Sequence, residues 1–263
     1  MPFNHVDRLS YFTFDIFDSF PIQQAVFTRR GGVSSNPWDY LNVGSTVGDN
    51  QANVNENRRR SFEAAGRDSE SMFDSWLEHG TQVLIADKPA PPSIDSPRKG
   101  DIIITDSPDV TLFMRYADCV PIMLFDRKIK AIALVHAGWV GTIRRAAAVA
   151  VDALSAHYGS SPADLIAAIG PSIASHHYEV SQDVADQVQE EFGDESADFL
   201  LQQNGSIHFD LWAANQAILK NAGVGQIDNP KICTACHLDD WFSHRAENGR
   251  TGRFGALIGL SKN

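Results

Sequence analysis

Two apolar segments in the middle of the chain, Val120–Phe125 and Ile129–Val135, are separated by a short polar break. This pattern predicts a β-hairpin with its turn at the break. If Arg127-Lys128 forms the turn, Cys119 lies directly opposite His136, with the two Cβ atoms roughly 5 Å apart. A thiolate and an imidazole at that separation can share a metal ion, or they can act as a nucleophile and its base.

The same two residues also fit a purely structural interpretation. Cysteine is among the most buried residue types, and a histidine at a strand end often only packs in the core. The neighbouring residues favour a site. Asp118 brings a charge to the start of an apolar strand, which is costly unless the carboxylate has a partner. Gly138, just beyond the second strand, lets a ligand approach the backbone closely.

Composition narrows the function classes. A chain of 263 residues has room for one large domain or two small ones. The net charge of -11 argues against a nucleic-acid partner and means that an anionic substrate needs local Arg or Lys. No apolar run approaches the ~20 residues that span a bilayer, so no membrane partner is expected. Met1–Arg8 lacks a secretory signal and three cysteines make no disulfide scaffold, so we expect a cytoplasmic location.

Hydrophobic periodicity and capping residues predict a mixture of strands and helices. The predicted strands are Gln24–Phe27, Asp101–Thr105, Val110–Arg115 and Leu165–Ile169, together with a strand within Ser75–Val83 that ends near His79-Gly80. The predicted helices are Asn50–Arg67, Thr142–Tyr158, Ser181–Phe192 and Leu211–Ala222, with Arg58–Arg60 on a solvated helix face. The order is not a regular βαβ alternation, which favours an α+β fold. The proline-rich stretch 87–100 is predicted to be a loop near a site. No Gly-x-Gly-x-x-Gly or Walker-type loop is present, so dinucleotide and nucleoside-triphosphate binding are not expected.

One short motif near the C-terminus suggests a different cofactor. Cys233-Thr234-Ala235-Cys236-His237 has the C-x-x-C-H spacing of covalent haem attachment. Haem attachment takes place outside the cytoplasm, and no secretory signal precedes this segment. A C-x-x-C redox pair is the second alternative, but no thioredoxin-like βαβ unit surrounds it. The preferred interpretation is coincidence, with Cys233 packing at a strand end.

Six segments together resemble the laccase-domain family, also called polyphenol-oxidase-like, whose members are regarded as zinc-dependent purine nucleoside phosphorylases. The segments are Thr28–Ser34, Leu41–Gly44 with Gly48-Asp49, His79–Thr81, Ala117–Pro121, His136–Trp139 with Gly141, and Gly170–Ile173. The tail adds Cys233-Thr234, Phe242-Ser243, Arg245 and Thr251–Arg253. The resemblance covers nearly the whole chain. We therefore expect an α+β fold of layered mixed β-sheets flanked by helices, α/β/β/α-like, as a single domain over residues 1–263.

The resemblance implies that His79, Cys119 and His136 bind one Zn²⁺ ion, with copper a weaker alternative. It implies phosphorolysis of adenosine, inosine, guanosine and methylthioadenosine, together with adenosine deamination. Small-molecule purine nucleosides and phosphate are then the expected partners. A guanidinium fork suits phosphate, so Arg29 and Arg245 are candidate substrate-binding residues. Asp118 is a third candidate, as a proton carrier or as an orienting group.

Two positions depart from the family pattern, and three other functions compete with the phosphorylase. Leu77 stands where the family usually has Gln, and Val140 where it usually has Arg. A copper laccase usually has His-x-His pairs, and this chain has none. A metal-free cysteine hydrolase would use Cys119 and His136, and relatives are linked to peptidoglycan-precursor editing, an amide hydrolysis. A structural zinc in a binding module is disfavoured by the open coordination position that three ligands leave.

Overall fold

The structure, a computed structural model, describes residues 3–93 and 95–262, and the remaining residues, which include Ile94 of the predicted loop, lie outside the description. Two six-stranded sheets form the centre of the described chain. The first sheet has the order β1 (Phe3–Val6), β2 (Leu9–Phe12), β3 (Ile22–Phe27), β15 (Phe254–Leu260), β7 (Thr111–Tyr116), β4 (Met72–Asp74). The second has the order β14 (Gln226–Asp228), β10 (Leu165–Ile169), β8 (Val120–Asp126), β9 (Ile132–Ala137), β6 (Ile102–Thr105), β5 (Val83–Ile85).

The two sheets pack face to face because both present apolar side chains to a shared core. Phe12, Met114 and Phe254 from the first sheet meet Met123 and Leu134 from the second in one buried cluster. Residues alternate faces along a strand, so the central strands of the second sheet, which are buried on both sides, read as continuous apolar runs. That is why β8 and β9 stand out in the sequence.

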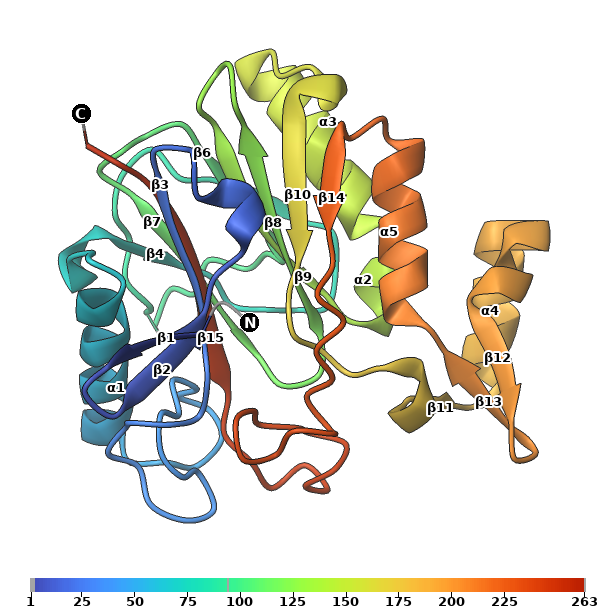
Figure 1. Cartoon of the computed structure of the whole chain (residues 1–263), viewed down its shortest axis with the longest axis horizontal. Helices are drawn as coiled ribbons and strands as arrows, with labels where there is room; N and C mark the ends of the chain where they lie inside the picture. The colour runs from blue at the N-terminus through green and yellow to red at the C-terminus, as the bar shows by residue number, and fades with distance from the viewer. Residues whose placement is uncertain (1–2, 94, 263) are drawn as a thin grey trace.

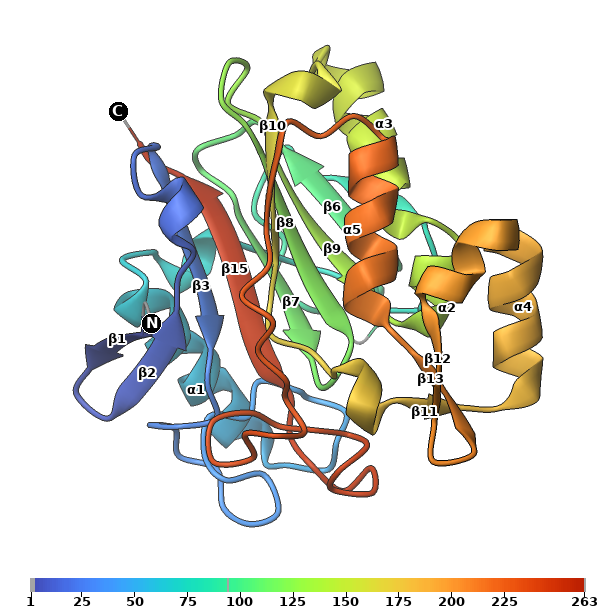
Figure 2. The same ribbon diagram turned by 45° about the vertical axis from the view of Figure 1, so that its right-hand side comes forward.

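Helices cover the outer faces of both sheets (Figure 1). Helix α1 (Gln51–Ala64) packs on the first sheet through Phe62, in a cluster with Phe27 and Leu257. Helices α3 (Ala146–Tyr158) and α5 (Leu211–Asn221) cover the second sheet, as Figure 2 also shows. The result is an α/β/β/α arrangement, and the predicted α+β fold of layered mixed sheets flanked by helices is confirmed.

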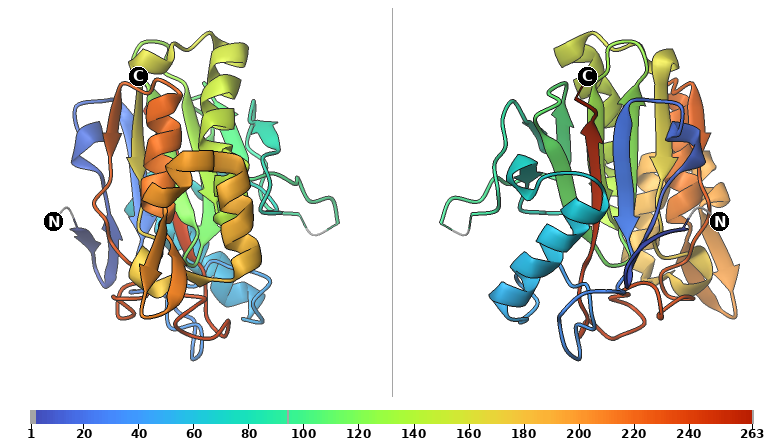
Figure 3. Two further views of the ribbon diagram at one scale, coloured as in Figure 1. Left: turned by 90° about the vertical axis from the view of Figure 1, so that its right-hand side faces the viewer. Right: turned by 60° about the vertical axis from the view of Figure 1, so that its left-hand side comes forward.

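A small third sheet lies beyond α5, together with α4 (Gln182–Phe192) (Figure 2). Its strands are β11 (Glu179–Val180), β13 (Ser206–Phe209) and β12 (Leu200–Gln203). Figure 3 shows that the proline-rich segment after β5 extends away from the body of the molecule. No helix among the described residues combines the length and the apolar character needed to cross a bilayer.

Two predicted elements differ from the structure. The strand predicted to end near His79-Gly80 ends earlier, because β4 stops at Asp74 and the chain then bends at His79-Gly80 before β5 begins at Val83. The predicted helix Thr142–Tyr158 is two helices, α2 (Trp139–Ile143) and α3. Arg145 separates them with a φ of +56°, a left-handed conformation that an α-helix cannot contain.

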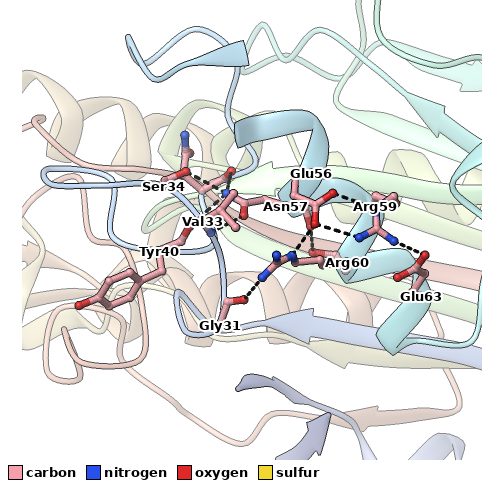
Figure 4. Close-up of polar contacts among 11 residues, drawn as sticks. Gly31, Val33, Ser34, Tyr40, Glu56, Asn57, Arg59, Arg60 and Glu63 are labelled. Carbon is pink, nitrogen blue, oxygen red and sulfur yellow. Dashed lines mark hydrogen bonds and ion pairs between the residues drawn. The ribbon is translucent and has the colours of Figure 1, made fainter. Parts of the chain in front are cut away.

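The arginine run in α1 is only partly solvated, which corrects the prediction for Arg58. Arg59 is exposed and Arg60 is half-buried, and both pair with Glu56, as Figure 4 shows. Arg58 is buried and donates two hydrogen bonds to the Val43 carbonyl. A guanidinium can be buried at this position because its hydrogen bonds are satisfied by the backbone of an adjoining loop.

Asn57 connects α1 to the loop that follows β3 (Figure 4). Its side-chain oxygen accepts from the Val33 amide at 2.9 Å, and its amide nitrogen reaches the carbonyls of Tyr40 and Asn42 and the Ser34 hydroxyl. The side chain is fully buried. A loop that lacks regular structure is thereby fixed in one conformation, and it continues directly to residues that line the cavity described next.

Candidate metal centre and cavity

A cavity of about 510 Å³ lies where β7, β8 and β9 meet the loops that follow β3, β4 and β5. Its lining includes His79, Cys119 and His136, the aromatic residues Trp76, Trp139 and Tyr178, and the arginines Arg98, Arg115, Arg245 and Arg253. Leu77, one of the two departures from the family pattern, also lines the cavity. Pro92 and Arg98 come from the proline-rich loop, which was predicted to lie near a site.

The three predicted metal ligands meet in this cavity. His79 comes from the bend after β4, Cys119 directly precedes β8, and His136 lies in β9. One ligand atom from each residue lies within 4.8 Å of the others. His136 is buried, Cys119 is half-buried and His79 is exposed. All three line the cavity. Two imidazoles and a thiolate so arranged can hold a single metal ion and leave a position open.

The hairpin is present, but its register differs from the prediction. Pro121, not Cys119, pairs with His136, and the connection spans residues 127–130 instead of a two-residue turn. Lys130 adopts a φ of +62° and closes the loop by donating its amide to Asp126. The shift moves each partner by two residues, which keeps side chains on the same face. Cys119 and His136 therefore remain neighbours on the cavity side.

Asp101 organises both histidine ligands, and the sequence analysis did not identify it. Its carboxylate accepts from three successive backbone amides, those of Glu78, His79 and Gly80, at 2.9–3.0 Å. His79 has a φ of +58°, and this left-handed residue lets the three N–H groups converge on one anion. Asp101 also contacts Nδ1 of His136 at 2.9 Å.

The Asp101 contact also fixes the tautomer of His136. The carboxylate can only accept, so Nδ1 carries the proton and Nε2 is the nitrogen with a lone pair available to a metal ion. Burial raises the pKa of Asp101, but the bonds from His136, Gly80 and Glu78 outweigh burial and hold that pKa below its usual value. The carboxylate therefore stays ionised and continues to orient the ring.

Cys119 is favoured as a thiolate. Burial raises the pKa of its thiol, but the nearby imidazoles of His136 and His79 outweigh burial and lower the pKa to about 6. Burial lowers the pKa of His136, but the nearby Cys119 and Asp101 outweigh burial and raise the pKa to about 9. The metal-free pair thus favours a thiolate beside an imidazolium. The thiolate is the form of cysteine that binds metals and attacks electrophiles.

Gly138 is required by the close packing of this group. A Cβ atom on Gly138 would lie 3.0 Å from the Cys119 sulfur and 3.4 Å from Cδ2 of His79. Its location just after β9 agrees with the expectation that a small residue permits close approach here. A larger side chain would press on the Cys119 sulfur and leave no space beside His79.

The three candidate substrate-binding residues have different positions. Asp118 and Arg245 line the cavity, and Arg29 is not among its lining residues. Arg29 donates to the Asp39 and Leu238 carbonyls and pairs with Glu247, and its guanidinium stacks on Phe242. These contacts connect the loop after β3 with the tail, and a direct contact between Arg29 and substrate remains a prediction.

The Asp118 carboxylate is already bound within the protein. One oxygen accepts from the Thr234 hydroxyl at 2.6 Å and the other from the Arg245 amide at 2.7 Å. Asp118 has a φ of +81°, which is rare for a residue with a side chain. The arrangement holds the tail against the Cys119 segment, so Asp118 positions Arg245 beside the cavity.

Positive charge is concentrated in the cavity although the chain is acidic overall. Arg245 stacks over the Tyr178 ring at 4.9 Å and donates to the Glu179 carbonyl. Burial lowers the pKa of Arg253, and the charges of Cys119 and Asp118 act to raise it. Arg115 forms an ion pair with the buried Asp74. An anionic group entering this cavity would meet several guanidinium groups.

Comparison with known proteins gives a consistent result. The family model described as multi-copper polyphenol oxidoreductase laccase matches residues 23–261. A Deinococcus radiodurans protein named purine nucleoside phosphorylase is 35% identical over 242 residues, covering 92% of this chain and 90% of that protein. A Bacteroides thetaiotaomicron protein of the same name is 31% identical over 249 residues, covering 92% of each. The crystal structure of YlmD from Geobacillus stearothermophilus superimposes with a TM-score of 0.89 at 29% identity, covering 99% of both chains.

Proposed function

The chain belongs to the family described as multi-copper polyphenol oxidoreductase laccase, and on that premise we propose that it is a zinc-dependent purine nucleoside phosphorylase that also deaminates adenosine. Relatives named purine nucleoside phosphorylase, such as the D. radiodurans protein, support the reaction class. The observation that carries the proposal is the convergence of His79, Cys119 and His136 in a cavity that also contains several arginines. Adenosine, inosine, guanosine and methylthioadenosine are the proposed substrates, with phosphate as the second substrate.

The donor set fits zinc. Imidazole and thiolate are the ligands of many zinc sites, and three protein ligands leave one position open, as in catalytic sites. The contact between Asp101 and His136 adds the carboxylate–histidine pair that commonly supports such a ligand. When bound, zinc supplies a Lewis acid next to the substrate. A laccase-type cluster of several coppers finds less support, because this group has only two histidines and the sequence has no His-x-His pair.

The rest of the cavity suits a nucleoside and phosphate. Its volume lies within the roughly 300–1,000 Å³ of typical small-molecule sites. Phosphorolysis breaks the glycosidic C1′–N9 bond, forms a C1′–O bond to phosphate, and releases the base with the bonding electron pair and a proton. Arg245 and Arg253 are the proposed phosphate ligands, since guanidinium groups bind phosphate oxygens in pairs. The aromatic rings of Trp139 and Tyr178 offer surfaces for the purine and the sugar.

A metal-free cysteine amide hydrolase is the second candidate, and one observation favours it. The lowered pKa of Cys119, its imidazole neighbour His136 and the orienting carboxylate of Asp101 form the nucleophile, base and orienting group of a catalytic triad. Editing of peptidoglycan precursors is the corresponding substrate class. This candidate retains activity when zinc is removed with a chelator, whereas the phosphorylase loses it.

The remaining proposals concern the chain as a whole. We propose that it works as one domain, because the family match spans residues 23–261 and the two large sheets share a core. We propose a cytoplasmic location, because Cys119, Cys233 and Cys236 are all free thiols, as in a reducing compartment.

The direct test is incubation of zinc-loaded protein with adenosine, with and without phosphate, followed by chromatography. The proposal predicts inosine without phosphate, and adenine together with hypoxanthine from inosine when phosphate is present. The variant His79→Ala should lose all of these products, and His157→Ala, which removes an exposed histidine of α3, should lose none. Full activity in His79→Ala, or no product from the wild type, would contradict the proposal.

A further inference from the structure

A second group of nitrogen and sulfur ligands lies outside the three-ligand group. It consists of His176 and His177, from the short 3-10 helix Ser175–His177, and of Cys233 and Cys236, from the segment between β14 and β15. One ligand atom from each of the four residues lies within 4.8 Å of the others. None of the four belongs to the ligand set that the family resemblance implies. We propose that these residues bind a second, structural zinc ion.

The backbone holds the two segments side by side. Ser172 and Cys233 form a β-bridge, in which the Ser172 amide donates to the Ile232 carbonyl and the Thr234 amide donates to the Ser172 carbonyl, both at 3.1 Å. The amide of Ala174 also donates to the Cys233 sulfur at 3.3 Å. The thiol of the buried Cys233 is therefore fixed next to the turn that carries both histidines.

The side chains of the other three residues complete the group. Nε2 of His176 lies 3.0 Å from the Cys236 sulfur, a contact that joins the two segments. The ring centroids of His176 and His177 are 4.6 Å apart, so the adjacent histidines present their rings together. Cys236 and both histidines are exposed, which gives a metal ion access from solvent.

The chemistry of the four ligands favours zinc over the alternatives. Two thiolates and two imidazoles make a Cys2His2 set, which in proteins is a closed tetrahedral structural zinc site. C-x-x-C is the usual thiolate spacing in such sites, although adjacent histidines replace the usual spaced pair. The haem motif would use His237, and the group that forms uses His176 and His177 instead. A Cys233–Cys236 disulfide is the competing state, and the test below includes it.

The second zinc would fasten one wall of the cavity. Tyr178 follows directly after His177 and lines the cavity, where Arg245 stacks on its ring. Thr234 lies between the two cysteines and donates to the Asp118 carboxylate at 2.6 Å. Both segments that hold the metal therefore also contact the cavity wall. A site with four protein ligands has no position for substrate, so its role is to hold these segments together.

Metal analysis of matched variants tests the proposal. After loading with Zn²⁺ and removal of excess, Cys236→Ser should hold one zinc ion fewer per chain than the wild type. Cys119→Ser should also hold one fewer, and the double variant should hold none. The matched control is His237→Ala, which removes an exposed histidine of the same segment and should retain the wild-type zinc content.

Two further readouts distinguish a bound metal from a merely altered surface. With Co²⁺ in place of Zn²⁺, the thiolate-to-metal charge-transfer absorption should fall more in the double variant Cys233→Ser/Cys236→Ser than in Cys119→Ser, because two thiolates are lost instead of one. Hydrogen exchange at residues 172–178 and 232–236 should rise in His176→Ala and stay unchanged in α1. Zinc content equal in the wild type and Cys236→Ser, or a Cys233–Cys236 disulfide in protein kept under reductant, would overturn the proposal. These outcomes do not depend on whether phosphorolysis is found.

Discussion

Substitution of Asp101 by Asn tests the idea that one buried carboxylate positions two metal ligands. Its side chain is 1% exposed and accepts four hydrogen bonds. Oδ1 accepts from the His79 amide and from His136, and Oδ2 accepts from the amides of Glu78 and Gly80. Asparagine has one oxygen and one NH2 group in the same volume. In either orientation the NH2 group faces two donors, so two of the four bonds are lost.

The size of the effect follows from those two bonds. A hydrogen bond to a charged group contributes about 1.5–3 kcal/mol, so Asp101→Asn should lower the free energy of unfolding by about 3–6 kcal/mol. Loss of a supporting carboxylate typically weakens metal binding by about 10–100-fold. The variant should therefore unfold at lower urea concentration and release zinc to a weaker chelator.

The assay is urea unfolding of the metal-free protein, together with competition for zinc against a chromophoric chelator. The control is Asp109→Asn, which removes a carboxylate that is 69% exposed and paired with Lys262 at the surface. That variant should stay within about 0.5 kcal/mol of the wild type. If Asp101→Asn matched this control in both stability and zinc affinity, the proposed role of Asp101 would be refuted.

Three further predictions concern other parts of the site. Asn57→Ala should destabilise the protein by about 2–5 kcal/mol in urea unfolding, because buried backbone groups lose their partners, whereas the exposed Asn55→Ala should change stability by about 0.5 kcal/mol or less. A small loss in Asn57→Ala would show that it does not fix the loop. Arg245→Ala should raise the phosphate KM by about 10-fold or more and Arg29→Ala should raise it less, and steady-state kinetics would expose the reverse order. In metal-free protein the pKa of Cys119 is lowered to about 6, so its alkylation rate should be near its maximum at pH 7 and should fall as pH drops through about 6. A midpoint of about 8.5, the value for an ordinary thiol, would contradict the ion pair with the His136 imidazolium.

The sequence predicted the central hairpin well because its signal is local. Two apolar runs with a short polar break are typical of a hairpin, and β8 formed where expected, whereas β9 begins at Ile132 instead of Ile129. The register differed because the loop at 127–130 is closed by Lys130 in a left-handed conformation, which composition does not reveal. The error was harmless to the site, since a shift of two residues retains the face on which Cys119 and His136 lie.

Long-range contacts explain what the sequence could not predict. His79 was placed at a strand end, but it sits in a bend whose shape depends on the Asp101 carboxylate. Nothing near Asp101 in the sequence distinguishes it from the other acidic residues. Arg58 cannot be told from Arg59 and Arg60 in the sequence, and its burial depends on the Val43 carbonyl of a separate loop.

The C-x-x-C-H segment is a second case in which long-range contacts could not be predicted from the sequence. Coincidence was the preferred interpretation, because no local signal connects Cys236 with any partner beyond the motif. The structure brings His176 next to it from 60 residues away. A motif that is incomplete in one segment can be completed by another, and only the folded chain shows which residues do so.

We propose that His79, Cys119 and His136 hold one zinc ion. Anomalous diffraction from crystals of zinc-loaded protein, measured on both sides of the zinc absorption edge, tests it most directly. We expect a peak within bonding distance, about 2.0–2.3 Å, of all three side chains. A zinc-loaded crystal with no anomalous peak among these residues would contradict the account.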